Sequence, residues 1–390
     1  MLYLDHAATT PVRPEVLTAM LPYLTDRFGN PSSHHTVGEA AASALAEARA
    51  RVAAVLGFRP NDIVFTSGGT EADNLAVKGL AIGAALRRGF SGAPVHVVTT
   101  PIEHEAVLSS CSYLERVHGF AVTHLPVDAT GTVDPADLAA AIRTSSLPTA
   151  MVSIGYANNE IGTVQDVASV AAVTKDAGVP LHLDAVQAAG WLPLADTGAD
   201  ALSIAGHKLG APPGIGALAV RSRLPLEPLL HGGGQERDRR SGTENLAGAV
   251  ALATALELAE AEREASAARV GAATRVFIDR ILALVPQAAL TGHPTRRLPG
   301  TASFTFAGTS GEAVLLGLER RGVITSSGSA CAAGSDEPSH VLLACGIAPE
   351  VAQTAVRFTF GHPAPGVAAP DPSVLAQAVA DAVAAVRSGA

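Results

Sequence analysis

The sequence has very little lysine: only Lys78, Lys175 and Lys208 occur among its 27 basic residues. Arginine therefore fills nearly every ordinary cationic position. An amine can lose its proton and form a Schiff base with a carbonyl group, whereas a guanidinium cannot. Lys175 lies just before Gly178 and suits a helix C-terminus. Lys208, in the motif AGHK, is therefore a candidate for forming a Schiff base, and the neighbouring residues must show whether it does so.

Cysteine is also scarce, and the count of three excludes a framework of paired disulfides and fits a reducing compartment. Cys111 and Cys345 have apolar neighbours at core spacing, which predicts inert buried thiols. Cys331 instead lies in SSGSACAAG, where nothing bulky can bury it. It is either a reactive nucleophile or an idle exposed thiol.

Long apolar runs and basic clusters are missing as well. No stretch reaches the ~18 to 20 apolar residues of a membrane span, and the start, MLYLDHAATTP, has no signal-peptide pattern, so we expect a cytoplasmic protein. The net charge of -9 argues against nucleic acid as a partner. Without CxxC or HExxH motifs, and with scattered histidines, the sequence predicts no metal site.

Strand-like and helical segments alternate along the first two thirds of the chain. This alternation predicts a mostly parallel sheet flanked by helices, with ligands at the carboxyl ends of the strands. Residues 35–56 read as a helix that ends at Gly57. A long helical tract from about Glu244 leads to a second domain, as the length of 390 residues suggests. The absence of GxGxxG and GxxxxGK disfavours a dinucleotide fold and a P-loop.

Several of these predicted strands have a polar residue at or just after their carboxyl end. His104, Asn159, Asp184 and Lys208 all occupy such positions, so we expect them to meet at one edge of the sheet. The segment VFTSGGTEADN predicts a strand, a glycine turn and a helix with Thr70 as its N-cap. This helix start is either an anion site or an ordinary turn.

The apolar residues of the segment AVRFTF alternate with Arg357 and Thr359. Arg357 therefore points away from the apolar face of a strand. A solvated arginine is the more common explanation for such a residue. A binding role needs a site nearby.

A lysine, an aspartate, a glycine turn and a histidine together describe a pyridoxal phosphate site. The motifs YLDHAATTP, FGNPSSHH, VFTSGGTEADNLA, IEHEAV, ANNEIG, LDAVQ, AGHK, HGGGQERDRRSGT and SSGSACAAG occur in this order. They closely resemble the cysteine desulfurases of the NifS/IscS group, in the class V aminotransferase family, from about residue 2 to residue 360.

The resemblance implies an α/β architecture, the fold-type I pyridoxal phosphate transferase, with a mostly parallel seven-stranded sheet flanked by helices and a smaller α+β domain. We expect the large, cofactor-binding domain to span residues 15–255. The small domain would combine residues 1–14 and 256–390, and its loop at about 324–338 would carry Cys331. A homodimer is also implied.

The resemblance also assigns roles to individual residues. Lys208 would bond to the cofactor and move protons, His104 would stack on its ring and relay protons, and Cys331 would be the nucleophile. The other cofactor contacts would be Asp184 at the ring nitrogen, Gln187 and Asn159 at the phenolic oxygen, and Thr70, His207 and the turn at Gly69 at the phosphate, with Thr243 from across a dimer interface. Arg357 would bind the substrate carboxylate, and Asn30 is a further substrate-side position.

The chain departs from the family in two places. Many members read SGHK where this chain has Ala205, so one hydroxyl donor to the phosphate is absent. The chain also ends at Ala390 without the long tail by which some members dock on a cluster scaffold, which puts such docking in doubt.

These expectations converge on one reaction: L-cysteine becomes L-alanine, and its sulfur becomes a persulfide on Cys331 for an acceptor such as an iron–sulfur cluster assembly protein. A selenocysteine lyase or another class V enzyme is the nearest alternative. A plain aminotransferase has no use for Cys331. A non-catalytic sulfur carrier would not require Lys208, Asp184 and His104 together.

Overall fold

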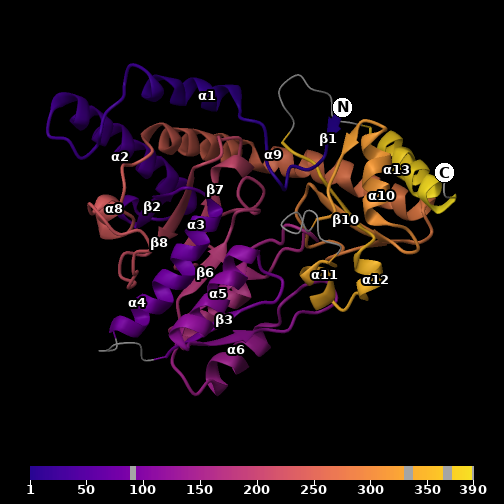
Figure 1. Ribbon diagram of the computed structural model, residues 1–390, viewed down its shortest axis with the longest axis horizontal. Coiled ribbons are helices and arrows are strands. Elements are labelled where there is room, and N and C mark those ends of the chain that lie inside the picture. Colours follow the sequence, from indigo (N-terminus) through magenta and orange to yellow (C-terminus); the bar gives the residue numbers. More distant parts are fainter. Residues whose placement is uncertain (88–93, 329–336, 363–370, 389–390) are drawn as a thin grey trace.

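The computed structural model describes residues 1–87, 94–328, 337–362 and 371–388. Three sheets organise them (Figure 1): one of seven strands, one of three and one of two. The expected α/β architecture is confirmed. None of the helices in these ranges has the length and apolar character needed to cross a membrane.

The large sheet has the strand order β2-β8-β7-β6-β5-β3-β4. Its strands are β2 (Ile63–Thr66), β3 (His96–Thr99), β4 (Ala121–His124), β5 (Thr149–Gly155), β6 (Leu181–Asp184), β7 (Ala201–Ala205) and β8 (Gly216–Val220). All neighbouring pairs are parallel except those of β8, which runs antiparallel to β2 and β7. The central strands are buried along their length, as expected for a sheet covered on both faces.

Two of the helices up to β6 precede β2, and the others follow β2, β3, β4 and β5. They are α1 (Pro14–Met20), α2 (Thr36–Leu56), α3 (Gly69–Asn74), α4 (Leu80–Arg87), α5 (Glu105–His118), α6 (Pro135–Thr144) and α7 (Val167–Ala177). Helix α2 ends at Gly57, which has a φ of 71°, as its sequence predicted. The prediction that Thr70 is an N-cap is wrong. Helix α3 begins at Gly69, with Gly68 as the cap residue and Thr70 inside the first turn.

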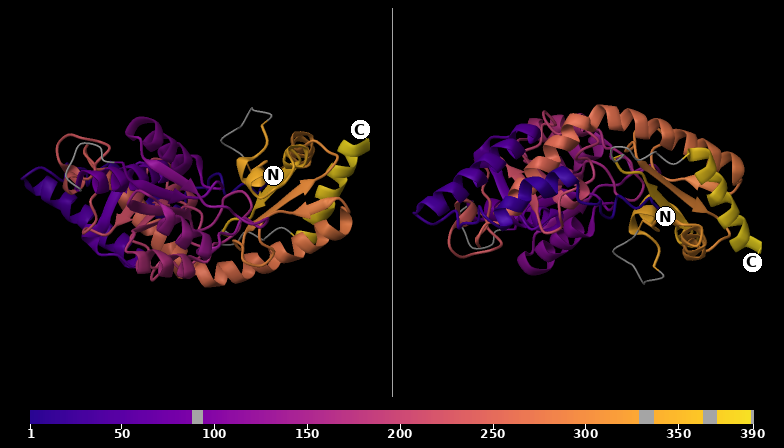
Figure 2. Two further views of the ribbon diagram at one scale, coloured as in Figure 1. Left: turned by 90° about the horizontal axis from the view of Figure 1, so that it is seen from below. Right: turned by 90° about the horizontal axis from the view of Figure 1, so that it is seen from above.

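The long helix α9 (Leu246–Leu284) runs from the large sheet to the smaller sheets (Figure 2). The remaining elements are β1 (Leu2–Tyr3), α8 (Gln235–Asp238), β9 (Ala288–Leu290), β10 (Thr301–Phe306), α10 (Gly311–Glu319), β11 (Val323–Ile324), α11 (His340–Ala344), α12 (Pro349–Ala352), β12 (Ala355–Thr359) and α13 (Pro372–Ser388). Strand β10 pairs antiparallel with β9 and β12, while β1 pairs parallel with β11. The domain boundary expected after residue 255 falls inside α9, and it stays a prediction.

Apolar side chains of β10, β12 and α9 form a core of their own beside the three-stranded sheet. The ring of Phe277 meets those of Phe304 and Phe358 edge to face, at centroid distances of 6.1 and 5.1 Å. Cys111 and Cys345 are buried in two other apolar clusters. Their predicted burial is thus confirmed, and it raises the pKa of their thiols to about 12 and about 11, which favours the unreactive thiol form.

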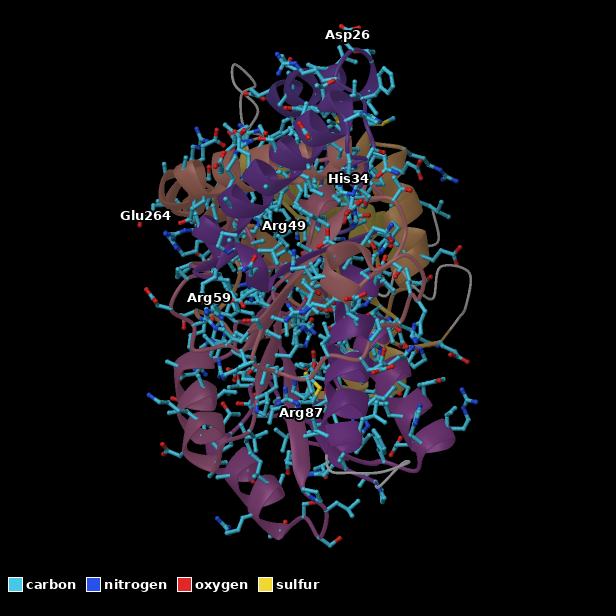
Figure 3. The ribbon with its side chains drawn as sticks, turned by 90° about the vertical axis from the view of Figure 1, so that its left-hand side faces the viewer. Asp26, His34, Arg49, Arg59, Arg87 and Glu264 are labelled. Carbon is cyan, nitrogen blue, oxygen red and sulfur yellow. The ribbon has the colours of Figure 1, made fainter. Side chains whose placement is uncertain are left out.

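A buried ion pair joins α2 to the short helix α8. The guanidinium of Arg49 (Figure 3) donates to both carboxylate oxygens of Glu236, at 2.6 and 2.7 Å, and also to the carbonyl of Ile63. The side chains of Arg49 and Glu236 are only 9% and 2% exposed. Glu236 also accepts a hydrogen bond from the backbone N–H of Phe65 in β2. This pair therefore fixes the loop after β8 against the edge of the large sheet.

Because the pair is buried, Glu236→Gln should leave the Arg49 charge without a counter-ion and lower the free energy of unfolding by ~3–5 kcal/mol. Urea unfolding checks this. The matched control is Glu264→Gln, since Glu264 is 87% exposed in its pair with Arg263 and should change the stability by less than about 1 kcal/mol. Equal effects of the two substitutions would contradict the structural role of the buried pair.

Candidate active site

A cavity of about 860 Å³ opens beside the carboxyl ends of β5, β6 and β7 and the start of α3. Its wall includes Gly155, Asp184 and Ala205, which end these three strands, and Gly69, which begins α3. The position confirms the expectation that ligand-binding residues collect at this edge of the sheet.

The cavity brings together most of the site residues expected from the sequence. Its lining includes Gly69, Thr70, His104, Asn159, Asp184, Gln187, His207, Lys208 and Arg357. Thr243 and Asn30 are exposed and are not part of this lining. Cys331 lies outside the described residues.

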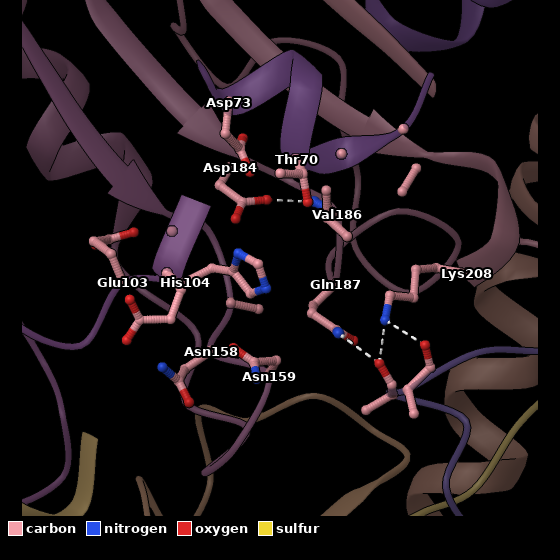
Figure 4. Close-up of a pocket in the computed structure, with 18 of the residues that line it drawn as sticks. Thr70, Asp73, Glu103, His104, Asn158, Asn159, Asp184, Val186, Gln187 and Lys208 are labelled. Carbon is pink, nitrogen blue, oxygen red and sulfur yellow. Dashed lines mark hydrogen bonds between the residues drawn. The ribbon is translucent and has the colours of Figure 1, made fainter. Parts of the chain in front are cut away.

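Lys208 ends a short 3₁₀ turn (Gly206–Lys208) directly after β7. Its Nζ donates to the backbone carbonyls of Ala7 and Ala8, the latter at 2.8 Å (Figure 4). Gln187 Nε2 donates to the same Ala7 carbonyl at 3.0 Å. The N-terminal segment therefore forms one wall of the site and orients the lysine amine.

Asp184 is the last residue of β6, and its Oδ1 accepts a hydrogen bond from the N–H of Val186 at 2.9 Å. Burial raises the pKa of the Asp184 carboxyl, while the Val186 N–H and the positive charge of Lys208 act in the opposite direction. The pKa of Asp184 is thus raised by burial, and the groups that oppose this rise include Lys208 on the cavity side.

His104 is the N-cap of α5, and its Nδ1 accepts a hydrogen bond from the N–H of Ala106 at 3.0 Å. An acceptor Nδ1 places the proton of the neutral ring on Nε2. Figure 4 shows the His104 ring in the cavity, below Asp184. The cap thus fixes both the position and the tautomer of the ring.

The glycine turn before α3 leaves space that a side chain would fill. A Cβ at Gly69 would lie 2.8 Å from Cγ2 of Val186 and 3.3 Å from Cβ of Ala205, whereas one at Gly68 would meet nothing within 4 Å. His207 lines the same cavity, and burial followed by the charge of Lys208 lowers the pKa of its imidazole to about 4. His207 is therefore neutral, and it can serve an anion as a hydrogen-bond partner but not as a cation.

Arg357 is buried and not solvated, so the more common explanation of its strand position is wrong. It is 1% exposed and forms an ion pair with Asp5 at 2.7 Å. Its NH1 donates to the carbonyls of Asn159 at 2.8 Å and Gly328 at 3.3 Å. Because this strand face packs against the N-terminal segment and the loop after β5, the guanidinium lies in the cavity wall.

Two buried acids of the cavity wall were not predicted from the sequence. Asp73 and Glu103 are 2% and 3% exposed. Asp73 looks like an ordinary polar residue on a helix. Glu103 is adjacent to His104, which was the predicted site residue at that strand end. Their positions after a glycine turn and after a buried strand were the available signals.

Residues 2–364 match the family described as aminotransferase class-V. The chain belongs to the class-V aminotransferase family. Membership of this family implies a pyridoxal phosphate cofactor.

The chain is also similar to individual proteins and solved structures of known name. The chain is 46% identical over 363 residues to "Cysteine desulfurase IscS" of Methanosarcina thermophila, covering 93% of this chain and 87% of that protein. It resembles the solved structure of a "NifS-like protein" with a TM-score of 0.87 and 32% identity, covering 98% of this chain and 99% of that one. It also resembles "SspA in complex with cysteine", with a TM-score of 0.80, 36% identity and coverage of 93% and 99%.

The residues present fit the implied cofactor. The class-V site has an amine at Lys208, a carboxylate at Asp184 and a turn at Gly68 and Gly69 that leaves room for a ligand. The cavity is in the size range of small-molecule sites. Within the described ranges, no group of three or more His, Cys, Asp or Glu side chains is arranged to hold a metal ion.

Proposed function

We propose that the protein is a pyridoxal phosphate-dependent cysteine desulfurase that converts L-cysteine to L-alanine and transfers the sulfur to Cys331. The observation that carries this proposal is the convergence of Lys208, Asp184 and His104 on one cavity. The names of the relatives support the substrate. So does the likeness to a structure titled as a complex with cysteine.

Each wall of the cavity would hold a different part of the cofactor. Lys208 would bind its aldehyde carbon, Asp184 its ring nitrogen, and the His104 ring would stack on its face. Gln187 and Asn159 would contact the phenolic oxygen, and Gly69, Thr70 and His207 the phosphate. When bound, the cofactor supplies an electron sink for negative charge at the substrate Cα.

The protein residues would then bind the substrate and move protons. Arg357 would attract the carboxylate of cysteine, with Asn30 as a further contact. The Lys208 amine, held near the Ala7 and Ala8 carbonyls, would remove the Cα proton as general base. His104, with its proton on Nε2, would relay protons.

Sulfur transfer would follow from attack by the Cys331 thiolate. A bond forms between Sγ of Cys331 and the substrate sulfur while the substrate C–S bond breaks. The electron pair of that bond stays with the carbon skeleton, which takes up protons and leaves as alanine. The persulfide would pass to an acceptor, for which we propose an iron–sulfur cluster assembly protein. The reducing cytoplasm would keep the thiol available.

The working unit would be a homodimer. Thr243 is exposed in this chain and would reach the phosphate site of the partner subunit. Large apolar side chains are exposed over one N-terminal stretch: Val12, Leu17, Leu21, Leu24, Phe28 and Val37 are 38% to 67% exposed. Asp26, within this stretch, lies at one extreme of the molecule (Figure 3). A second copy would cover such a stretch.

Cys331→Ala should retain the absorbance of the bound cofactor and lose the release of sulfide and alanine from L-cysteine, because the sulfur then has no acceptor. Lys208→Ala should instead lose the absorbance of the lysine-linked cofactor. Spectra combined with a product assay separate the two effects. Full activity of Cys331→Ala would refute the role of the nucleophile.

Ala205→Ser should strengthen cofactor binding by restoring the hydroxyl found in many relatives. One added hydrogen bond to an anionic phosphate contributes about 1.5–3 kcal/mol, or roughly a 13- to 160-fold lower Kd. Titration of the cofactor-free protein with pyridoxal phosphate measures it. Ala205→Val adds bulk without a hydroxyl and should not tighten binding. An unchanged Kd for the serine variant would show that another group already fills this place.

Phe28→Asp should weaken the proposed dimer, because it places a charge where an apolar side chain 67% exposed in the single chain would be buried by a second copy. Light scattering coupled to size-exclusion chromatography gives the mass. Val374→Asp, at a residue 68% exposed near the other end of the chain, is the control and should remain dimeric. A monomeric wild type would overturn the dimer proposal.

A further inference from the structure

Three carboxyl groups lie in one wall of the cavity. Asp73 comes from α3, Glu103 precedes α5, and Asp184 ends β6. Figure 4 shows Asp73 next to Asp184, on the side away from Lys208. Oδ1 of Asp73 and Oε2 of Glu103 are buried without a well-formed hydrogen bond among the described residues. The Ser203 hydroxyl near Asp73, and the Thr100 hydroxyl and Gly155 N–H near Glu103, lower the pKa of these carboxyls, but burial raises it more. A buried ionised oxygen in this situation would be unfavourable by several kcal/mol.

No base behind the cluster can neutralise Asp73. His182 Nε2 lies 3.8 Å from Asp73 Oδ1, beyond hydrogen-bond distance. Both ring nitrogens of His182 are already bonded, to the hydroxyls of Ser153 and Ser203 at 2.9 Å each. A neutral ring uses one nitrogen as donor and the other as acceptor, and burial lowers the pKa of this imidazole to about 3. His182 is therefore neutral.

The charges around the cluster act unequally on its three members. The positive charge of Lys208 favours the ionised form of Asp184. The charged groups that act on Asp73 are Asp184 and Glu103, and both oppose its ionisation. Asp184 likewise opposes the ionisation of Glu103, and burial is the largest factor in raising the pKa of that carboxyl to about 8. Interacting carboxyls of this kind share protons unequally.

We propose that Asp73 and Glu103 each carry a proton at neutral pH, so that the negative charge of the three-carboxyl cluster lies on Asp184. Asp73 and Glu103 are then positioning residues that act through Asp184. Their neutral carboxyls keep the charge next to the cavity and away from the apolar interior. That this charge faces the ring nitrogen of a cofactor rests on the proposed function, whereas the protonation states do not.

Other titratable groups face the cluster and enter its pH dependence. They are His182 on β6, Cys111 and the cap His104 of α5, Lys208 after β7, and His340 on α11, whose Nε2 lies 3.0 Å from the Glu103 carbonyl. His182 and Cys111 are neutral at neutral pH, for the reasons given above. The experiment must therefore identify each carboxyl directly.

Infrared spectra of the full-length protein with its cofactor bound supply that identification. Protonated carboxyls give a C=O stretching band, and carbon-13 in the carboxyl group shifts this band. Labelling either aspartate or glutamate therefore identifies which bands come from each residue type. At neutral pH we expect one such band from aspartate, lost in Asp73→Asn, and one from glutamate, lost in Glu103→Gln. The exposed controls Asp176→Asn and Glu115→Gln should remove neither. A wild-type spectrum without these bands, or bands that survive the two substitutions, overturns the proposal.

A second measurement follows from linkage. Between the pKa of glutamate in the unfolded chain, ~4.3, and about 8 in the folded protein, the folded state holds one more proton, so stability falls as the pH rises. Glu103→Gln removes this dependence. The melting temperature of the variant should therefore rise relative to that of the wild type between pH 5 and pH 8, and a difference that is flat or falls would contradict the protonated Glu103. Neither measurement uses turnover, so failure of the desulfurase proposal would be distinguishable.

Discussion

Parallel pairing of β6 with β7 is the constraint on which the site depends. Asp184 lies opposite Ser203 in this register, and the chain passes from β7 into the turn that presents Lys208. Neighbouring parallel strands end at the same edge of a sheet, so a carboxylate and an amine 24 positions apart face one cavity. A shift of one residue would turn Asp184 toward the opposite face of the sheet.

The N-terminal segment completes the site by joining the small sheets to this edge. Asp5 pairs with Arg357 on β12, the N–H of Ala7 donates to Thr359 Oγ1 at 2.9 Å, and the carbonyls of Ala7 and Ala8 hold the Lys208 amine. Burying an arginine is costly unless its charge is paired. Here Asp5 and two backbone carbonyls accept from the two terminal NH2 groups of Arg357, while its Nε has no partner among the described residues. The contacts that offset part of the desolvation cost of Arg357 therefore also hold the N-terminal segment and β12 together at the cavity.

The sequence predicted the strands, the long helix and most of the cavity lining, because hydrophobic patterning and polar residues at strand ends are local signals. It failed where tertiary packing decides. Arg357 looked solvated because its burial depends on Asp5, which is 352 positions away. Thr70 looked like an N-cap, but the two glycines allow α3 to start two residues earlier. Thr243 and Asn30 lie away from the cavity of a single chain, and sequence alone does not say whether a second chain brings them in.

Asp73 and Glu103, behind Asp184, are an arrangement that is unfavourable for stability but useful for the proposed chemistry. An apolar side chain in place of Glu103 would avoid burying a polar oxygen that lacks a well-formed hydrogen bond. The carboxyl is also tightly enclosed, since a Cβ added at Gly155 would lie 3.1 Å from Oε2 of Glu103. Such an arrangement costs stability. A chemical role explains why it persists: a carboxylate is effective beside a ring nitrogen only if its charge is not drawn into the protein, and neutral polar neighbours achieve this without adding a competing charge.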